Sequence, residues 1–540
     1  MATNTKIVVA DPISNRGLEL LQAAGWQVVI PAKGNLAGEL RDAEALIVRS
    51  ATRVTADLLA GAPRLRVVGR AGVGVDNIDV EAATERGILV MNTPGSNAVS
   101  VAEHTLALLL ALTRRIPQLN AALHAGRWEK SAIAGIELRG KTLGLIGFGR
   151  VGTEVARRAR ALEMRVLASD PYLSPEAAAE SGVALVPLPT LLEQSDFVSL
   201  HASLSPTTEN MIHRGTLAQM RRGAYLINTA RGELVDEAAL ADALRSGHLA
   251  GAAVDVFAEE PPRNSPLLGL PNLIATPHVA GSTAEAQEEV GHRIAQQVRD
   301  YLAEGLIRNA VNLPVLSPEQ YRRLRPYLDL ADRLGRFVAQ AMTARLARIR
   351  ITCAGEPAEL GTHLLRNAVL SGILSTVLEE NVTVVNAPRL AAARGLLVEE
   401  RTRRREFGFP NTLEVSLEAE DPGTGRALSV EGTVLAGTTP RILAVDGIEL
   451  EAPLAGTLLF TRNRDVPGVI GKMGTLLGER GINIATFALG RREAVRGAEA
   501  LAIVRLDGPV PEAILDPIRS IEAVVEARLI HLPEQETAKP

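Results

Sequence analysis

Short apolar runs alternate with helical patterns through the first three hundred residues of the chain. The runs are rich in valine, isoleucine and leucine, and turn residues bound each of them. They lie at residues 7–10, 45–48, 67–69, 143–147, 166–169, 197–200, 225–228, 251–254 and 273–275. This alternation predicts an α/β protein with doubly wound parallel sheets that carry helices on both faces.

Two proline-rich breaks divide the rest of the chain. Asn312-Leu313-Pro314 and Ser317-Pro318 predict a linker, because a proline biases the residue before it away from helix. The second break is at residues 453–456. Between them, the pattern predicts an α+β unit with a long amphipathic helix at 319–342. Its strand candidates are 348–352, 382–385, 413–417, 429–434 and 441–445.

The last segment has a pattern of its own. It predicts, in order, a strand, a helix, two strands, a helix and a strand. These elements lie at residues 457–461, 467–479, 483–489, 500–506, 511–521 and 524–530. The order βαββαβ is the ferredoxin-like arrangement.

Bulk composition narrows the possible functions. A chain of 540 residues is too long for one core, which stops growing at roughly 250 to 300 residues. The net charge of -4 and the lack of aromatics among the basic residues argue against nucleic acid. The densest basic run is Arg403, Arg404 and Arg405, for which a solvated face is favoured over an anion site.

Cysteine content and apolar run length bear on the compartment. The one cysteine, Cys353, cannot form an internal disulfide, and no Cys/His spacing indicates a metal. The N-terminus lacks a secretory pattern. The longest helical apolar run, 105–112, is shorter than the ~20 residues of a membrane span. We expect a cytoplasmic protein with no metal and no membrane partner.

A glycine-rich loop follows the apolar strand at 143–147 and opens a helix. Gly147, Gly149 and Gly152 permit a tight turn and let backbone N–H groups approach a pyrophosphate. Asp170 ends the next strand, near the ~20-residue offset at which an acid meets the ribose hydroxyls. The 2′-phosphate of NADP would meet this carboxylate, and no arginine directly follows Asp170 to offset the repulsion. NAD is therefore preferred over NADP. The alternative for Asp170 is a turn residue at the strand end.

Three further segments follow successive strands of the same predicted sheet. They are residues 229–232, 255–261 and 276–281. Ligands bind at the carboxyl ends of strands in doubly wound sheets, so the three segments are expected to converge on one crevice.

One residue of each segment suits hydride chemistry. His278 is the candidate base for the hydroxyl proton, and Glu260 is the carboxylate that orients its imidazole. Arg231 offers a planar fork for a substrate carboxylate. The alternatives are that His278 is a structural histidine and that Glu260 is an exposed acid in a loop.

Polar residues in the first hundred positions suggest a phosphorylated substrate. Arg49 and Arg70 each end a predicted strand, and a phosphate needs such cations. The alternative is surface charge. Asn97 precedes the first long helix, where it either caps that helix or binds substrate.

The three segments after the glycine loop resemble the signature motifs of the D-isomer-specific 2-hydroxy acid dehydrogenases, over roughly residues 7–313. The residues that follow resemble the intervening and ACT domains of long phosphoglycerate dehydrogenases. The resemblance implies a discontinuous flavodoxin-like substrate domain (1–96 and 284–313) around a Rossmann-type NAD-binding domain (97–283). An α+β intervening domain (314–453) and a ferredoxin-like ACT domain (454–532) complete the chain.

The resemblance implies NAD-dependent oxidation of 3-phospho-D-glycerate to 3-phosphohydroxypyruvate, the first step of L-serine biosynthesis. It assigns Arg49, Arg70 and Asn97 to the substrate. It assigns these residues to the cofactor: Gly147, Gly149, Arg150, Val151, Gly152, Asp170, Thr229, Ala230, Arg231, Asp255, His278 and Gly281. Val73 stands where some relatives have threonine. The alternatives are another 2-hydroxy acid dehydrogenase and an NADH-sensing, corepressor-like binding protein, which would need a longer tail.

The resemblance also implies regulation by L-serine. Asn463, Asp465 and Asn483 match polar positions of serine-binding ACT domains, which usually bind the effector across two chains. This implies a homotetramer that contacts through both its nucleotide domains and its ACT domains. Val466 departs from the arginine of many relatives. The alternative is that Asp465 caps the following helix.

Overall fold

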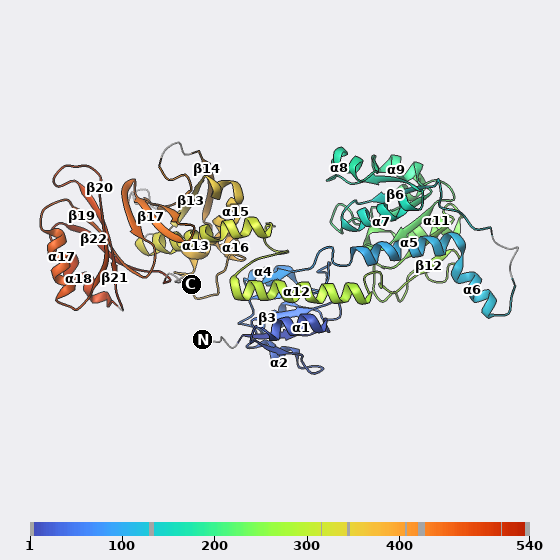
Figure 1. Ribbon diagram of the computed structural model, residues 1–540, viewed down its shortest axis with the longest axis horizontal. Coiled ribbons are helices and arrows are strands. Elements are labelled where there is room, and N and C mark those ends of the chain that lie inside the picture. The colour runs from blue at the N-terminus through green and yellow to red at the C-terminus, as the bar shows by residue number, and fades with distance from the viewer. Residues whose placement is uncertain are drawn as a thin grey trace.

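Figure 1 shows an elongated molecule, with the glycine-loop sheet at one end and the C-terminal sheet at the other. This computed structural model describes residues 5–128, 134–314, 316–342, 346–404, 408–419, 427–508 and 510–534. The described residues form four sheets, each built from one stretch of the chain.

The first sheet is parallel, with the strand order β2-β1-β3-β4-β5 that is typical of flavodoxin-like folds. Its strands are β1 (Lys6–Val9), β2 (Gln27–Val29), β3 (Ala45–Val48), β4 (Val67–Arg70) and β5 (Leu89–Met91). Its helices are α1 (Asn15–Gln22), α2 (Leu36–Leu40), α3 (Ala56–Ala60), α4 (Val80–Glu85) and the later α12 (Ala284–Glu304). Ile294 and Val298 of α12 pack against Gly69, so the chain returns to this sheet after the second one.

The second sheet is also parallel, with the order β12-β11-β10-β9-β6-β7-β8. Its strands are β6 (Thr142–Ile146), β7 (Arg165–Ser169), β8 (Ala184–Leu185), β9 (Phe197–Leu200), β10 (Tyr225–Asn228), β11 (Gly251–Val254) and β12 (Leu273–Ala275). Its helices are α5 (Ala98–Arg114), α6 (Ile116–His124), α7 (Arg150–Ala161), α8 (Pro175–Glu180), α9 (Leu188–Gln194), α10 (Arg214–Gln219) and α11 (Glu237–Arg245), with a short 3-10 turn at Gly232–Leu234. The order reverses between β6 and β9, the switch point where such sheets bind ligands.

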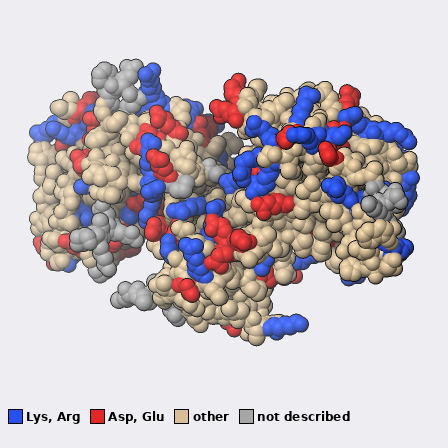
Figure 2. Space-filling model, turned by 45° about the vertical axis from the view of Figure 1, so that its right-hand side comes forward, with Lys and Arg blue, Asp and Glu red and all other residues tan. Residues whose placement is uncertain are grey.

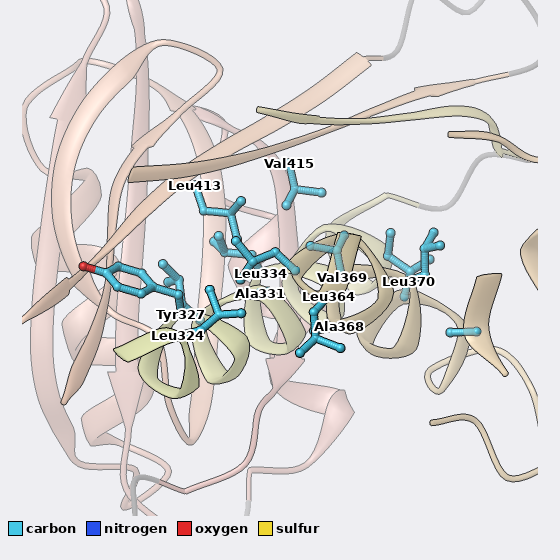
Figure 3. Close-up of a cluster of buried hydrophobic side chains, with 14 of the residues drawn as sticks. Leu324, Tyr327, Ala331, Leu334, Leu364, Ala368, Val369, Leu370, Leu413 and Val415 are labelled. Atoms are coloured by element: carbon cyan, nitrogen blue, oxygen red, sulfur yellow. The ribbon is translucent and has the colours of Figure 1, made fainter. Parts of the chain in front are cut away.

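The third sheet is mixed, with the order β14-β13-β15-β16-β17-β18. Its strands are β13 (Leu346–Ala354), β14 (Leu397–Arg403), β15 (Thr412–Ala419), β16 (Ala427–Leu435), β17 (Thr439–Val445) and β18 (Ile448–Pro453). Its helices are α13 (Pro318–Ala341), α14 (Glu356–Leu360), α15 (Thr362–Leu374) and α16 (Ala387–Ala393). Leu334 of α13, Val369 of α15 and Leu413 of β15 meet in its core (Figure 3).

One predicted strand of this unit is wrong. Residues 382–385 form a turn rather than a strand. The backbone N–H of Thr383 donates to Asn386 Oδ1 at 2.8 Å, and Asn367 donates to the Val384 carbonyl at 2.9 Å. These hydrogen bonds with side chains take the place of the backbone hydrogen bonds that a strand would make with a neighbouring strand. The turn also contacts the first domain, because Thr383 Oγ1 donates to the Gly87 carbonyl at 3.0 Å.

The fourth sheet has the order β20-β21-β19-β22, which confirms the ferredoxin-like prediction. Its elements are β19 (Thr457–Arg464), α17 (Val469–Gly478), β20 (Ile484–Arg491), β21 (Glu499–Leu506), α18 (Leu515–Arg519) and β22 (Val524–His531), with a 3-10 turn at Glu512–Ile514. The predicted fold class is therefore confirmed, while the predicted domain boundaries stay predictions.

Acidic and basic side chains are interspersed over the face that Figure 2 shows. Among the residues that the structure describes, no helix combines the length and apolar character that a membrane crossing needs. Within the same residues, no group of three or more His, Cys, Asp or Glu side chains is placed to hold a metal ion.

Candidate active site

A cavity of about 1010 Å³ separates the first two sheets. It is lined by loops at the carboxyl ends of strands in both sheets, as the sequence predicts. The structure brings together here all the predicted catalytic and substrate residues: Arg49, Arg70, Asn97, Arg231, Glu260 and His278. Of the predicted cofactor residues, Gly147, Gly152 and Asp170 are not among the residues that line the cavity.

The glycine loop between β6 and α7 shows why each glycine is needed. Gly147 has φ +89°, and a Cβ there would lie 2.7 Å from the Ala202 nitrogen. A Cβ on Gly152 would lie 2.6 Å from the Gly147 carbonyl oxygen. Gly149, by contrast, faces open space at the N-terminus of α7, where no side chain caps the free N–H groups. The loop therefore fits a pyrophosphate at Gly149.

Asp170 contacts the back of this loop. Its Oδ2 accepts from the Phe148 backbone N–H at 2.7 Å, and its Oδ1 accepts from the Tyr172 N–H at 2.8 Å. The second contact is the turn contact that the sequence left open as an alternative. The first fixes the carboxylate beside the nucleotide loop.

His278 and Glu260 form a direct pair. His278 Nδ1 lies 2.7 Å from Glu260 Oε2, and Glu260 Oε1 accepts from the Phe257 backbone N–H at 3.1 Å. His278 has a positive φ of +52°, which is uncommon for a non-glycine residue, although histidine adopts it more often than most. Because Nδ1 contacts the carboxylate, Nε2 is the ring nitrogen left for substrate.

Asp255 organises the loop that carries His278. Its buried carboxylate accepts from Thr276 Oγ1 at 2.5 Å and from the backbone N–H groups of Val279 at 3.0 Å and Ala280 at 2.8 Å. The predicted cofactor residue Asp255 thus lines the cavity while its oxygens are bound to the loop.

Arg231 and Arg70 approach the same glycine-rich loop of the first domain. A Cβ on Gly72 would collide with the Arg70 guanidinium, and one on Gly74 would collide with that of Arg231. Burial, and after it repulsion from Arg231, lowers the pKa of Arg70. The buried Nε of Arg70 has no hydrogen-bond partner within the described residues. Such a cation is expected to bind an anion.

Arg49 and Asn97 complete the substrate side. The Arg49 backbone N–H donates to Asp11 Oδ2 at 2.6 Å, which fixes the loop after β3. Asn97 occupies the N-cap position of α5, but its side chain makes no capping bond. A Cβ on Gly281 would lie 2.7 Å from Asn97 Nδ2, so this amide faces the His278 loop.

His201 is a cavity residue that sequence reasoning missed. It follows β9, and Ser199 Oγ lies 2.9 Å from its Nε2. Its Nδ1 is buried and has no partner among the described residues. Burial lowers the pKa of His201 to about 4, so its ring is neutral at pH 7. A histidine directly after the strand next to the glycine loop was the available signal.

The predicted effector residues lie far from the cavity, at opposite ends of the fourth sheet. Ile484, next to Asn483, pairs with Leu506, which faces Thr457 at the start of β19. Asn463 lies near the other end of β19. One chain therefore does not bring Asn483 to Asn463. Asp465 does not cap α17, whose N-cap is Gly468; its carboxylate lies 3.3 Å from Arg491 Nη1.

The basic run is only partly described. Arg403 Nη1 lies 3.5 Å from Glu414 and its Nη2 pairs with Glu431, on an exposed face. Arg405 lies outside the described residues. These ion pairs fit the solvated-face interpretation.

Family comparisons agree with this architecture. Residues 106–280 match the D-isomer specific 2-hydroxyacid dehydrogenase NAD binding domain. Residues 323–446 match the D-3-phosphoglycerate dehydrogenase intervening domain, and residues 457–523 match the ACT domain. The second sheet is therefore an NAD-binding domain.

Similar proteins extend the match over nearly the whole chain. D-3-phosphoglycerate dehydrogenase of Methanocaldococcus jannaschii is 41% identical over 98% of this chain and 100% of its own length. The protein of that name from Bacillus subtilis is 38% identical over 98% of this chain and 100% of its own length.

Solved structures match the first two domains. The TT0316 protein of Thermus thermophilus is 38% identical with a TM-score of 0.52, covering 57% of this chain and 100% of its own. NAD-dependent formate dehydrogenase from Staphylococcus aureus, in complex with NAD, is 30% identical with a TM-score of 0.52, covering 58% of this chain and 100% of its own. From its motifs, its sheets and these full-length relatives, the chain belongs to the D-3-phosphoglycerate dehydrogenase family.

Proposed function

We propose that this protein oxidises 3-phospho-D-glycerate to 3-phosphohydroxypyruvate with NAD, the first step of L-serine biosynthesis. One observation carries the proposal: the His278–Glu260 pair and three arginines line the same cavity. A base next to an orienting carboxylate suits removal of a hydroxyl proton. Several guanidiniums suit a substrate that carries both a carboxylate and a phosphate.

The proton step falls to His278. Its Nδ1 contacts Glu260 at 2.7 Å, so Nε2 faces the cavity as the base. As the hydroxyl proton moves to Nε2, the imidazole gains a positive charge that the Glu260 carboxylate stabilises. Glu260 also fixes the ring orientation, because its other oxygen is held by the Phe257 backbone.

The anion contacts divide between the two walls of the cavity. Arg231 would hold the substrate carboxylate through its planar fork. Arg70 and Arg49 would hold the phosphate from the first domain, with Asn97 beside them. Both walls are needed, so the substrate is bound between the domains.

The NAD site is built from the glycine loop and the strand ends near it. When bound, NAD supplies the carbon that accepts the hydride. The open face of Gly149 and the free N–H groups of α7 fit the pyrophosphate, and Asp170 is the acid for the adenosine ribose. The other predicted residues, Arg150, Val151, Thr229, Ala230, Asp255 and Gly281, line the cavity near the reacting end or the loop.

A substrate panel tests the activity. The purified protein is given NAD and, in turn, 3-phospho-D-glycerate, D-glycerate, D-lactate and glycolate, and NADH formation is followed. We expect the highest kcat/KM for 3-phospho-D-glycerate and little rate with NADP. A higher kcat/KM for an unphosphorylated acid would instead indicate another 2-hydroxy acid dehydrogenase.

We also assign a serine effector site to Asn463, Asp465 and Asn483, formed between two chains. Asn463 Oδ1 is buried without a partner in the described residues, and Asn483 lies at the opposite sheet end, so a second chain would supply the missing half of the proposed site. Exposed apolar side chains of α6 and the loop after it, Ile116, Leu123 and Trp128, suit a second contact between nucleotide domains. Together these contacts would give a homotetramer.

Serine titration tests this assignment. Millimolar L-serine should lower the wild-type rate, and Asn483→Ala should weaken that inhibition while leaving the uninhibited rate unchanged. If wild type neither binds nor responds to serine, the effector assignment fails and the dehydrogenase assignment is unaffected.

A further inference from the structure

Asp76 of the first domain contacts Arg231 of the NAD-binding domain. Asp76 Oδ2 lies 3.4 Å from Arg231 Nε. Asp76 follows β4 and Arg231 follows β10, so this ion pair joins the two walls of the cavity. Asp76 places a carboxylate among the cations that are expected to bind an anionic substrate. A negative charge there repels the substrate, so its position calls for a physical explanation.

The contacts of the Arg231 guanidinium explain why a carboxylate lies here. Its Nη1 donates to its neighbour, the Ala230 carbonyl, at 2.7 Å, and its Nε faces Asp76. A guanidinium has five N–H groups, so the outer N–H groups on Nη1 and Nη2 remain for a bidentate carboxylate. Asp76 and Ala230 therefore flank the guanidinium at Nε and at Nη1, and the edge between Nη1 and Nη2 stays open for a carboxylate.

The loop that carries Asp76 is rigidly held. Asn77 Nδ2, next to it, donates to the carbonyls of Arg49 at 2.7 Å and Thr52 at 2.6 Å. The Val54 N–H donates to the Asn77 carbonyl at 2.8 Å. The same loop needs Gly74, because a Cβ there would collide with the Arg231 guanidinium. The loop is thus shaped to receive this guanidinium and to place a carboxylate beside it.

We infer that Asp76 is a positioning residue that orients Arg231 for the substrate carboxylate from across the cavity. This inference rests on the proposed function. Because the two side chains belong to different domains, the pair exists only when the cavity walls are close together. Closure of the cavity therefore also orients the arginine, which couples binding of the carboxylate to the arrangement of the domains.

Two substitutions of Asp76 separate positioning from charge. Asp76→Ala removes the carboxylate that lies beside Arg231 Nε, so KM for 3-phospho-D-glycerate should rise about five- to twentyfold, with KM for NAD unchanged. Asp76→Asn keeps an amide oxygen beside Nε and removes a negative charge from an anion site. Its KM should therefore equal the wild-type value or fall below it. Asp57→Ala, which removes an exposed carboxylate of the same domain outside the cavity, is the matched control and should change neither constant.

Two further comparisons make the result decisive. The loss in Asp76→Ala should be the same for D-glycerate, because Asp76 acts through the carboxylate and not the phosphate. In an Arg231→Lys background, Asp76→Ala should add little, since the oriented group is already gone.

Other outcomes overturn the inference. If Ala and Asn both lower KM, Asp76 only repels the anion, and if neither changes it, Asp76 is a bystander. An unchanged rate and KM in Arg231→Ala would remove Arg231 from the proposed function itself, which distinguishes that failure from a failure of Asp76 alone.

Discussion

Two contacts between domains of this chain are built in opposite ways. The first, between the substrate-binding and NAD-binding domains, encloses a cavity of about 1010 Å³ and is crossed by polar groups. The Asp76–Arg231 pair is one of them, and the Asp76 side chain is 69% exposed. Arg150 adds a second by donating to the Pro94 carbonyl. Polar, solvated contacts of this kind can open and close at little cost.

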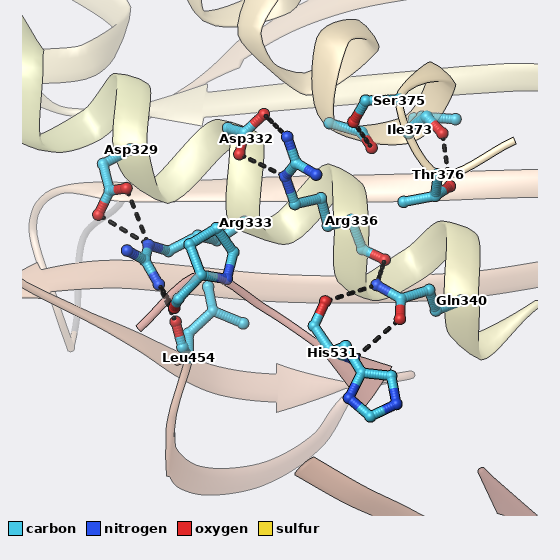
Figure 4. A network of polar contacts seen from close by, with 12 residues as sticks. Asp329, Asp332, Arg333, Arg336, Gln340, Ile373, Ser375, Thr376, Leu454 and His531 are labelled. Atoms are coloured by element: carbon cyan, nitrogen blue, oxygen red, sulfur yellow. Dashed lines mark hydrogen bonds and ion pairs between the residues drawn. The ribbon is translucent and has the colours of Figure 1, made fainter. Parts of the chain in front are cut away.

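The second contact, between the intervening and ACT domains, is more buried and is held by hydrogen bonds from a side chain to backbone carbonyls. Arg333 of α13 is 5% exposed, and its Nη1 donates to the carbonyls of Leu454 at 3.2 Å and Pro533 at 2.5 Å (Figure 4). One side chain thus holds both the entry and the exit of the ACT domain. The rings of Phe337 and Phe460 pack edge to face across the same junction, 5.8 Å apart.

The two contacts suit two different tasks. A cleft that binds and releases a charged substrate needs solvated walls, whereas the proposed effector domain would need a stiff attachment to the rest of the chain. Substitutions of exposed side chains in the cleft, such as His278, should therefore change kinetics and leave stability unchanged. Substitutions at the junction should do the reverse.

The largest effect is expected in the cleft. His278→Ala should lower kcat by at least ~10²-fold, because proton transfer loses its base. The side chain is 52% exposed, so the melting temperature should stay at the wild-type value. Steady-state kinetics and calorimetry measure the two quantities. An unchanged kcat would remove His278 from the mechanism.

At the junction, Arg333→Ala should lower the free energy of unfolding of this unit by roughly 2 to 3 kcal/mol, because the buried Leu454 carbonyl and the Pro533 carbonyl lose their charged donor. The dehydrogenase rate without effector should remain. Arg336→Ala is the control, since Arg336 lies on the same helix and pairs with Asp332 at 2.7 Å. Denaturant unfolding and limited proteolysis after residue 453 compare the two. If both variants lose the same free energy of unfolding, the hydrogen bonds of Arg333 across the junction contribute no more than an ion pair within the helix.

A smaller effect is expected from Arg70→Ala, again in the cleft. KM for 3-phospho-D-glycerate should rise about tenfold, while KM for D-glycerate changes less, because only the phosphorylated acid loses a charge-assisted bond. Arg53→Ala, an exposed arginine of the same domain, is the control. Equal increases for both substrates would refute the phosphate assignment.

The smallest effect concerns pH. Burial lowers the pKa of His201 from 6.5 to about 4, so the unfolded chain binds a proton here that the folded chain does not. Stability contributed by this group is full above pH 6.5 and is lost as the pH falls toward 4. His201→Gln should therefore show a shallower fall in melting temperature over that range. Parallel curves for the two proteins would mean that His201 titrates normally.

Local patterns predicted much of this fold. Nine of the twelve strands of the first two sheets and the βαββαβ order follow from apolar periodicity and from glycines at turns, which act over a few residues. The short strands β2, β5 and β8 were not predicted. The strand expected at 382–385 fails because Asn367 and Gly87, distant in sequence, bind its polar groups instead. Strand β14, at the sheet edge, was missed because its charged, exposed side chains give no apolar alternation.

The candidate site divides in the same way. Residues in motifs, such as Gly149 and His278, could be predicted to line the cavity, because their proposed roles need a fixed residue type after a strand. Asp76 and His201 were missed because their roles depend on partners from another segment. Sequence spacing does not reveal that the Arg231 guanidinium lies beside Asp76, or that the His201 ring is buried.

Transfer of deuterium tests the central claim most directly. The substrate is 3-phospho-D-glycerate deuterated at the carbon that bears the hydroxyl, and the reduced cofactor is analysed by mass spectrometry after incubation with NAD. The proposed reaction predicts NADH that carries the deuterium, formed by wild type and at least ~10²-fold more slowly by His278→Ala. No NADH, or NADH without the label, would contradict hydride transfer from this hydroxy acid.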